Sequence, residues 1–283
     1  MITLFVNRLT VLDASLLDPE LGLLGESWLV DAELEGSLDH QGMVLDFGDV
    51  KRRLKQIIDQ QFDHRLLVPG QARNCRIETS GPRCRVELQL PDGGWLEHSS
   101  PRDAVTIIDA PAVNGDSLAH AIGDAITPQL PDNVHRLRLR LAPESIEGAW
   151  YRYSHGLKHH SGNCQRIAHG HRSRIHLFLD GERDATLEAA WARRWRDIYL
   201  GTRADLLETF ERNGVPCYRF GYTAGQGRFE LALPRSRCDL IDTDTTVENL
   251  ARHIAATLAA EHPGSRIRVR AFEGVDKGAI AEA

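Results

Sequence analysis

The residues best suited to chemistry gather in one short stretch of the second half of the chain. His169 and His171 are separated by a single glycine, and residues two apart on a strand project from the same face. Both imidazoles can therefore reach one ion. His155, on the strand expected just before, would add a third nitrogen and leave the fourth position of a tetrahedral Zn²⁺ open to water or substrate. The pattern predicts a catalytic zinc site; the alternative is three surface histidines without a common ligand.

Cys164 lies a few residues before this histidine pair. By its position it could be a fourth zinc ligand, a catalytic thiol or a small buried hydrophobic residue. A thiol near Zn²⁺ and near the positive charges of Arg166 and Arg172 would be suited to proton transfer or nucleophilic attack. The residues around Cys164 leave these readings open.

The elements that must position these residues follow from the hydrophobic pattern. Alternation predicts strands over residues 2–6 and 27–34 that pair as an antiparallel hairpin, and further strands over 83–90 and 136–141. Helical spacing predicts amphipathic helices over 49–62 and 116–126. The second half repeats the order, with strands at 151–157, 169–179 and 266–272 and helices at 186–199 and 248–260.

Two halves of similar layout suggest an internal duplication. We therefore expect two units, residues 1–148 and residues 149–283, although common helix and strand patterns could produce the same similarity by chance. Residues 201–242 have no counterpart that we can align with the first half. They form either an insertion or a rewritten part of the second repeat.

Composition narrows the class of protein. The 283 residues are 42% hydrophobic and 26% charged, with no apolar run as long as a membrane span. The first residues do not resemble a secretory signal, so we expect a cytoplasmic protein. Five widely spaced cysteines argue against a disulfide framework. A net charge of -6 makes nucleic acid an unexpected partner, and we expect no membrane partner either.

Several motifs together resemble the 6-pyruvoyl-tetrahydropterin synthase and 6-carboxytetrahydropterin synthase family. They are His155, the run 164–171, the stretch 42–47 (Gly-Met-Val-Leu-Asp-Phe) and the stretch 62–67, which contains Asp63 and His64. The resemblance covers nearly the whole chain, one family unit in each half. It implies an α+β tunnelling fold (T-fold), in which antiparallel sheets with helices on one face close into a barrel by homo-oligomerisation.

The resemblance also assigns roles to residues. It implies Zn²⁺ held by His155, His169 and His171, with Cys164 as catalytic cysteine and Asp63 and His64 supplied by a neighbouring unit. Glu273 would grip the pterin ring, because a carboxylate can accept two hydrogen bonds from its N–H groups. Glu248 would be a second polar contact, and Arg166, Arg172 and Arg174 could meet a triphosphate. The alternatives are a charge-paired histidine at a helix end for Asp63 and His64, and solvated surface charges for the glutamate and the arginines.

The departures from the family pattern are complementary. In the first half, the zinc positions are expected at Ser15, Leu24 and Glu26, so that unit should bind no metal, and in the second half no Asp-His pair follows the first helix. Each half lacks what the other has, which implies one composite site per complementary pair of halves. The implied activity is a zinc-dependent lyase that acts on 7,8-dihydroneopterin triphosphate and eliminates triphosphate, with the product left open. The alternative is an inactive zinc-binding scaffold.

Overall fold

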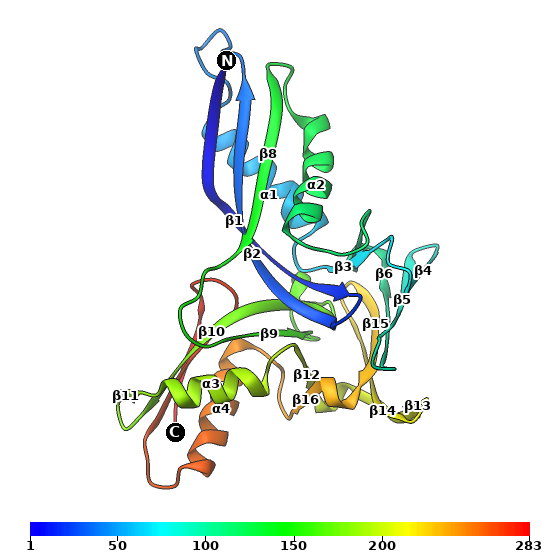
Figure 1. Cartoon of the computed structure of the whole chain (residues 1–283), viewed down its shortest axis with the longest axis vertical. Helices are drawn as coiled ribbons and strands as arrows, with labels where there is room; N and C mark the ends of the chain where they lie inside the picture. Colours follow the sequence, from blue (N-terminus) through cyan, green and yellow to red (C-terminus); the bar gives the residue numbers. More distant parts are fainter.

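The computed structural model describes residues 1–283 as two units of the same construction, stacked along the long axis of the molecule (Figure 1). The first unit contains β1 (Ile2–Asp18), β2 (Gly22–Gly36), α1 (Phe47–Gln61), β3 (Leu66–Pro69), β4 (Cys75–Ser80), β5 (Arg83–Gln89), β6 (Trp95–Pro101), β7 (Val105–Ile108), α2 (Gly115–Ile126) and β8 (Val134–Pro143). The second contains β9 (Trp150–His155), β10 (His169–Leu179), β11 (Glu182–Arg183), α3 (Ala185–Arg194), β12 (Ile198–Thr202), β13 (Leu206–Arg212), β14 (Val215–Ala224), β15 (Gly227–Pro234), β16 (Cys238–Ile241), α4 (Val247–Glu261), β17 (Ile267–Phe272) and β18 (Gly278–Glu282).

The main sheets of the two units have the same strand order. The first runs β7-β3-β1-β2-β8, and the second runs β16-β12-β9-β10-β17 and adds β18. This agrees with the expected duplication, and the predicted hairpin of the first two strands is confirmed by the pairing of β1 with β2. The expectation of wholly antiparallel sheets is wrong, because β1–β3, β3–β7, β9–β12 and β12–β16 pair in parallel. Each parallel strand returns to the sheet after a crossover through a helix or a strand meander.

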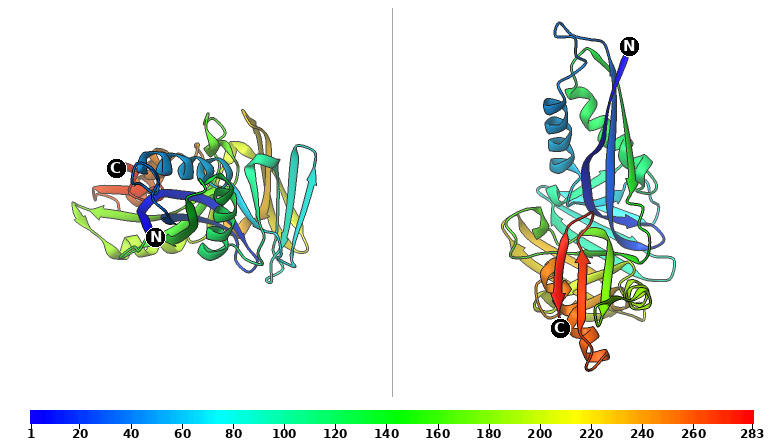
Figure 2. Two further views of the ribbon diagram at one scale, coloured as in Figure 1. Left: turned by 90° about the horizontal axis from the view of Figure 1, so that it is seen from above. Right: turned by 90° about the vertical axis from the view of Figure 1, so that its left-hand side faces the viewer.

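Helices cover one face of each main sheet (Figure 2). In α1, whose N-cap is Asp46, the residues Val50, Leu54 and Ile58 are buried against β1 and β2, as their spacing predicted. The helix predicted over 186–199 is too long. The helix ends at Arg194. Asp197 then adopts a positive φ of +56°, and the residues after it form β12.

Residues 201–242 do have a counterpart in the first unit, contrary to the expectation from sequence. Strand register aligns Leu66 with Tyr199 and Val105 with Cys238, a constant offset of 133 residues, so β4–β6 correspond to β13–β15 without a gap. Two residue types recur at this offset and could have revealed the repeat. They are the turn glycines Gly81 and Gly214, both at positive φ, and the strand-ending prolines Pro101 and Pro234.

The two meanders join into one sheet, β13-β14-β15-β6-β5-β4. Its central pair, β15 with β6, is antiparallel, which is the arrangement expected when two like units are related by an approximate twofold axis. A core of 20 buried residues on this sheet draws side chains from both units, including Leu17, Leu66, Ile167 and Tyr199. The halves are therefore packed as one body. Separately, no helix has both the length and the apolar character needed to span a membrane.

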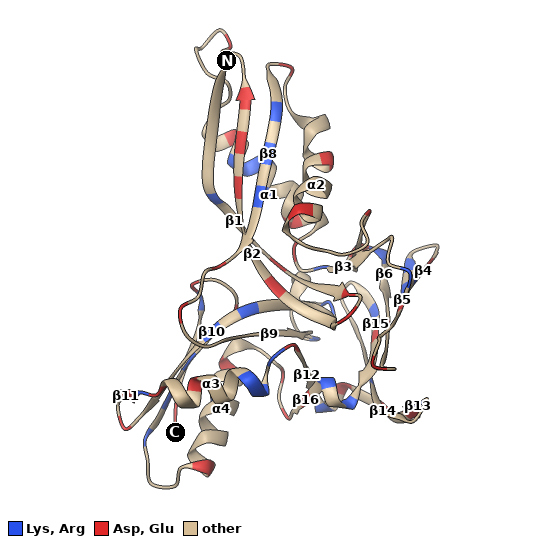
Figure 3. Cartoon of the chain, in the orientation of Figure 1, with Lys and Arg blue, Asp and Glu red and all other residues tan.

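Strand β8 is an outer edge of the first sheet. Its arginines Arg136, Arg138 and Arg140 lie opposite the acidic residues Glu35, Glu33 and Asp31 of β2 (Figure 3). The side of β8 away from β2 has no partner strand within the chain. An edge of this length presents backbone groups that another strand can pair with.

Candidate functional site

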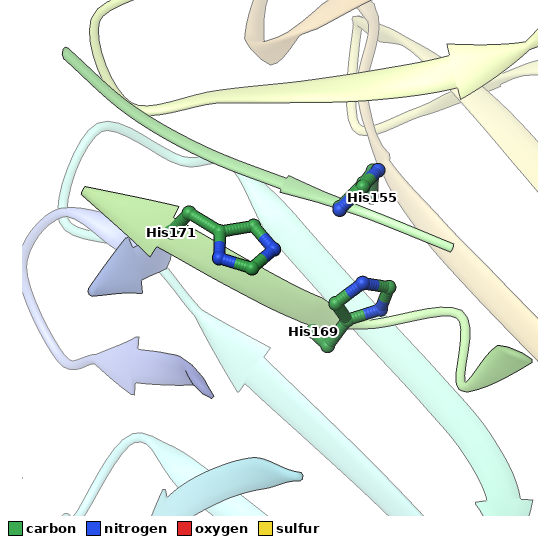
Figure 4. A group of neighbouring side chains, drawn as sticks. All are labelled: His155, His169 and His171. Atoms are coloured by element: carbon green, nitrogen blue, oxygen red, sulfur yellow. The ribbon is translucent and has the colours of Figure 1, made fainter. Parts of the chain in front are cut away.

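Three imidazoles converge where β9 ends and β10 begins. His155 is directly opposite His169 in the antiparallel pairing, and their ring centroids are 4.2 Å apart. His171 follows two residues later on the same face. One nitrogen from each ring lies within 4.8 Å of the others, and all three residues are buried (Figure 4). The pair that alternation predicted therefore does meet the third histidine.

The outer nitrogen of each ring faces a polar partner. His155 Nδ1 lies 3.0 Å from the carbonyl oxygen of Thr245, His169 Nδ1 lies 3.0 Å from that of Arg166, and His171 Nδ1 lies 3.3 Å from Asp13 Oδ1. A carbonyl can only accept, so in His155 and His169 it fixes Nδ1–H as donor and leaves the lone pair on Nε2.

The three Nε2 atoms are buried and have no hydrogen-bond partner, and His171 Nδ1, 3.3 Å from Asp13 Oδ1, is also buried without a formed hydrogen bond. A buried unpaired polar atom is costly, and three imidazole lone pairs directed to one region are the donor set of a catalytic zinc site. Burial, followed by the nearby histidines, lowers the pKa of His155 and His169 well below its ordinary value, so both are neutral and able to bind a metal. The residues present thus fit Zn²⁺.

The first unit brings Asp63 and His64 to this centre. His64 Nδ1 lies 2.5 Å from Asp63 Oδ2, and the His64 ring is 5.3 Å from that of His169. Burial alone would lower the pKa of His64. Hydrogen bonding to Asp63 and then to Cys164 outweighs it and raises that pKa to about 10. The chain therefore places an imidazolium between a carboxylate of its own unit and the cysteine of the other.

The backbone of Asp13 on β1 holds the Asp63–His64 pair in place. Asp13 N–H donates to Asp63 Oδ1 at 2.9 Å, and His64 N–H donates to the Asp13 carbonyl at 2.7 Å. His64 has a φ of +53°, an unusual conformation for a residue with a side chain. These two bonds help stabilise that turn and aim the imidazole at the second unit.

The meander β14–β15 clamps the loop that carries Cys164. Tyr222 Oη donates to the Gln165 carbonyl at 2.9 Å, and Gln226 N–H donates to Gln165 Oε1 at 2.6 Å. Arg166, only 5% exposed, donates from Nε to Gln226 Oε1 and from a terminal nitrogen to the His64 carbonyl. Burial and then Arg65 lower the pKa of Arg166 to about 10. Residues 201–242, which the sequence left without a role, therefore support the loop that carries Cys164.

The remaining predicted residues are placed differently. Glu273 borders the site, with Oε1 3.9 Å from His171 Nε2. Glu248 is exposed in the first turn of α4 and forms no hydrogen bond or ion pair with the site. Arg172 lies over the Trp150 ring at 4.0 Å, and Arg174 pairs with Glu144, so both arginines are engaged with other side chains.

The twofold-related location in the first unit holds ion pairs. Strand register aligns His155, His169 and His171 with Leu16, Leu24 and Glu26, so the first of these positions is Leu16 and not Ser15 as expected. Ser15 instead donates a hydrogen bond to Ser154 Oγ at 2.7 Å across the unit boundary. Two of the three aligned side chains are aliphatic and cannot bind a metal.

The Asp63–His64 pair also has positional counterparts, Arg196 and Asp197, in the second unit. Asp197 pairs with Arg152 Nε at 2.6 Å, and Arg152 lies 3.9 Å from Glu26. The candidate zinc site contains imidazoles, a thiol and an acid–histidine pair. The twofold-related position contains guanidinium–carboxylate pairs instead.

Sequence reasoning missed Asp13, Thr245 and Lys277, which surround the histidines. Asp13 Oδ2 is 3.3 Å from Lys277 Nζ, and its Oδ1 accepts from Ser27 Oγ at 2.5 Å. Burial raises the pKa of Asp13, but the nearby His171 and Lys277 and the hydrogen bond from Ser27 lower it overall. The available signal was a charged residue inside an otherwise apolar strand.

Comparison with known proteins finds the same family in both halves of the chain. A model of the 6-pyruvoyl tetrahydropterin synthase family matches the chain twice, over residues 22–154 and 146–283. The proposed 6-carboxy-5,6,7,8-tetrahydropterin synthase of Pyrococcus horikoshii is 28% identical over 117 residues, which are 41% of this chain and 66% of that protein. Its counterpart in Pyrococcus abyssi is 25% identical over 119 residues, 42% of this chain and 67% of that protein. The match thus spans just under two thirds of the first relative's length.

Among solved structures, 6-pyruvoyl tetrahydropterin synthase from Plasmodium vivax is 16% identical, with a TM-score of 0.42 over 52% of this chain and 93% of that chain. The enzyme from Plasmodium falciparum is 14% identical, with a TM-score of 0.41 over 50% of this chain and 91% of that chain. The two family matches, one in each half, confirm the resemblance that the sequence motifs indicated.

Proposed function

Because the chain belongs to the 6-pyruvoyl tetrahydropterin synthase family, we propose that it is a zinc-dependent lyase that acts on 7,8-dihydroneopterin triphosphate and eliminates triphosphate. One observation carries the proposal. Asp63 and His64 of the first unit meet Cys164 and the three histidines of the second unit, so the parts that each half lacks are brought together within one chain.

The residues divide the chemistry among them. Zn²⁺, held by the Nε2 atoms of the three histidines, would act as a Lewis acid on hydroxyl oxygens of the substrate side chain. Cys164 takes a proton from the side chain as general base. His64, whose pKa is raised by Asp63 and Cys164, assists Cys164 by charge and hydrogen bonding, and Asp63 fixes the orientation of the His64 ring.

Substrate binding uses groups at the border of the centre. Glu273 accepts hydrogen bonds from the pterin ring, in keeping with its position beside His171. Arg166 attracts the triphosphate, and its buried guanidinium is held between Gln226 and the His64 carbonyl. Glu248, which is exposed on α4, would contact only a part of the substrate that extends beyond the metal.

We also propose that the chain works as a homo-oligomer of two-unit protomers, with units 1–148 and 149–283. The unpaired edge of β8 supports this, because a ten-residue edge strand is suited to pairing with another copy and closing the barrel.

The test is turnover of 7,8-dihydroneopterin triphosphate by the zinc-loaded chain, followed as release of triphosphate. We expect activity in the wild type and its loss in Cys164→Ala and in His64→Ala. The matched controls are Cys238→Ala, a cysteine of β16, and His159→Ala, an exposed histidine. Both should remain active. An inactive wild type with full zinc occupancy would refute the lyase and favour the zinc-binding scaffold.

A further inference from the structure

Asp13 is a buried carboxylate that the reaction proposed above does not use. It lies on β1 of the first unit and is only 4% exposed. Its side chain has three polar neighbours: Ser27 Oγ at 2.5 Å, Lys277 Nζ at 3.3 Å and His171 Nδ1 at 3.3 Å. A carboxylate buried to this extent is expensive unless each oxygen has a partner, so its position needs an explanation.

The three neighbours come from both units. Ser27 belongs to the first unit, and His171 and Lys277 belong to the second. Ser27 Oγ also accepts a hydrogen bond from the backbone N–H of Arg172 at 3.1 Å, which ties β2 to β10 at this point. Asp13 is therefore fixed where the two units meet.

The same residue supports the other half of the site through its backbone. Its N–H and C=O hold Asp63 and His64, as described above. One residue thus touches a metal-binding imidazole with its side chain and the proton-transfer pair with its main chain.

A simple ion pair between Asp13 and Lys277 does not account for the geometry. The Lys277 side chain is 52% exposed and lies near Asp13 Oδ2, whereas the histidine and the serine face Oδ1. The twofold-related position supports the same conclusion. There, Arg152 is the register counterpart of Asp13 and lies 3.9 Å from Glu26, the counterpart of His171, so a cation faces an anion where Asp13 faces an imidazole.

We propose that Asp13 is a positioning residue for the metal centre: across the unit boundary its carboxylate accepts Nδ1–H of His171 and so presents Nε2 to Zn²⁺. A carboxylate behind a ligating histidine fixes the tautomer and ring orientation and makes the other nitrogen a better donor. Zinc affinity is then linked to the docking of the first unit, which also delivers His64. The inference rests on the zinc site of the proposed function.

The test is zinc affinity of the full chain, measured by competition with a chromophoric chelator. Asp13→Asn keeps the shape of the side chain but removes its negative charge. We expect this variant to bind Zn²⁺ about 10- to 100-fold more weakly than wild type. Glu26→Gln is the matched control, because it neutralises another buried carboxylate of the same sheet that touches no zinc histidine. Its affinity should equal that of wild type.

Lys277→Met separates positioning from a structural ion pair. If Asp13 serves His171, removing the lysine leaves zinc affinity within about threefold of wild type, whereas a purely structural pair predicts equal losses in both variants. The tautomer of His171 in metal-free protein, read from its ¹⁵N chemical shifts, gives a second measurement. We expect Nδ1–H in wild type and a mixture of tautomers in Asp13→Asn.

Equal zinc affinity in Asp13→Asn and wild type would overturn the inference. If Asp13→Asn does not fold, Ser27→Ala removes one bond that orients the carboxylate, and an affinity lower by about fivefold is expected; no change would contradict the positioning role. A wild type that binds no Zn²⁺ refutes both this inference and the proposed function. A wild type that binds Zn²⁺ but lacks turnover refutes the lyase alone.

Discussion

Replacing Asp63 by asparagine removes the carboxylate 2.5 Å from His64 Nδ1 while keeping a side chain of the same shape. The wild-type pKa of His64 is about 10, compared with 6.5 for an unperturbed imidazole, although burial opposes this rise. An opposite charge at hydrogen-bonding distance typically moves a pKa by about 1–3 pH units, or about 1.4–4 kcal/mol. We expect Asp63→Asn to lower the pKa of His64 by that amount, with Cys164 supplying the remaining upward shift.

The assay is an NMR titration of the His64 ring protons from about pH 5 to about pH 11. This range covers both the unperturbed pKa of 6.5 and the raised pKa of about 10. Metal-free protein isolates the effect of Asp63, because a bound divalent cation would itself repel a proton from the ring. Asp59→Asn serves as control, since it removes the same charge from an exposed pair with Lys55. Cys164→Ala measures the second contribution.

Stability supplies a further readout of the same interaction. Because the folded pKa is raised, the stabilisation is fully present below pH 6.5 and is lost as pH rises through about 10. This decline in the free energy of unfolding should be shallower in Asp63→Asn than in wild type. An unchanged His64 titration in Asp63→Asn, or a wild-type pKa near 6.5, would refute the assignment of His64 as the protonated partner of Cys164.

Three further predictions concern the scaffold. Gly170→Ala should lower the free energy of unfolding, measured by urea denaturation, by about 1–3 kcal/mol, because a Cβ there would lie 2.5 Å from the Gly25 Cα. Gly123→Ala in α2 is the control. A Cβ there meets nothing within 4 Å, so this variant should instead be more stable by about 0.5–1 kcal/mol. Arg174→Met should cost about 2 kcal/mol by leaving the buried Glu144 unpaired, and adding Glu144→Gln should restore most of the loss in the same assay. Burial and then Arg83 lower the pKa of His98 to about 3, so the unfolded chain takes up its proton first and stability falls between pH 6.5 and pH 3. His98→Leu should flatten that fall by up to about 5 kcal/mol, and an unchanged acid profile would exclude His98 as its source.

Local pattern was sufficient wherever one short segment determined the outcome. The spacing of His169 and His171 required a strand, and β10 is that strand. The apolar spacing in residues 49–62 required a helix with one buried face, and α1 buries Val50 and Leu54. In both cases the information lies in residues two to four positions apart, because backbone periodicity fixes which side chains share a face.

Local pattern failed where pairing across the chain decided the outcome. Residues 198 and 199 were included in the predicted helix, yet they begin β12 because they pair in parallel with β9. The counterpart of His155 was expected at Ser15, and strand register moves it to Leu16. Register depends on which strands meet, and a shift of one residue reverses the face of every side chain.

The sequence by itself determined the residue types of the site: three histidines, a cysteine and an acid–histidine pair divided between two halves of one chain. Only the tertiary structure decided that His64 approaches Cys164 within a single chain and that Asp13 lies behind His171. These contacts join residues about a hundred positions or more apart. They depend on the packing of one unit against the other, at Gly25 against Gly170, and no local periodicity encodes such packing.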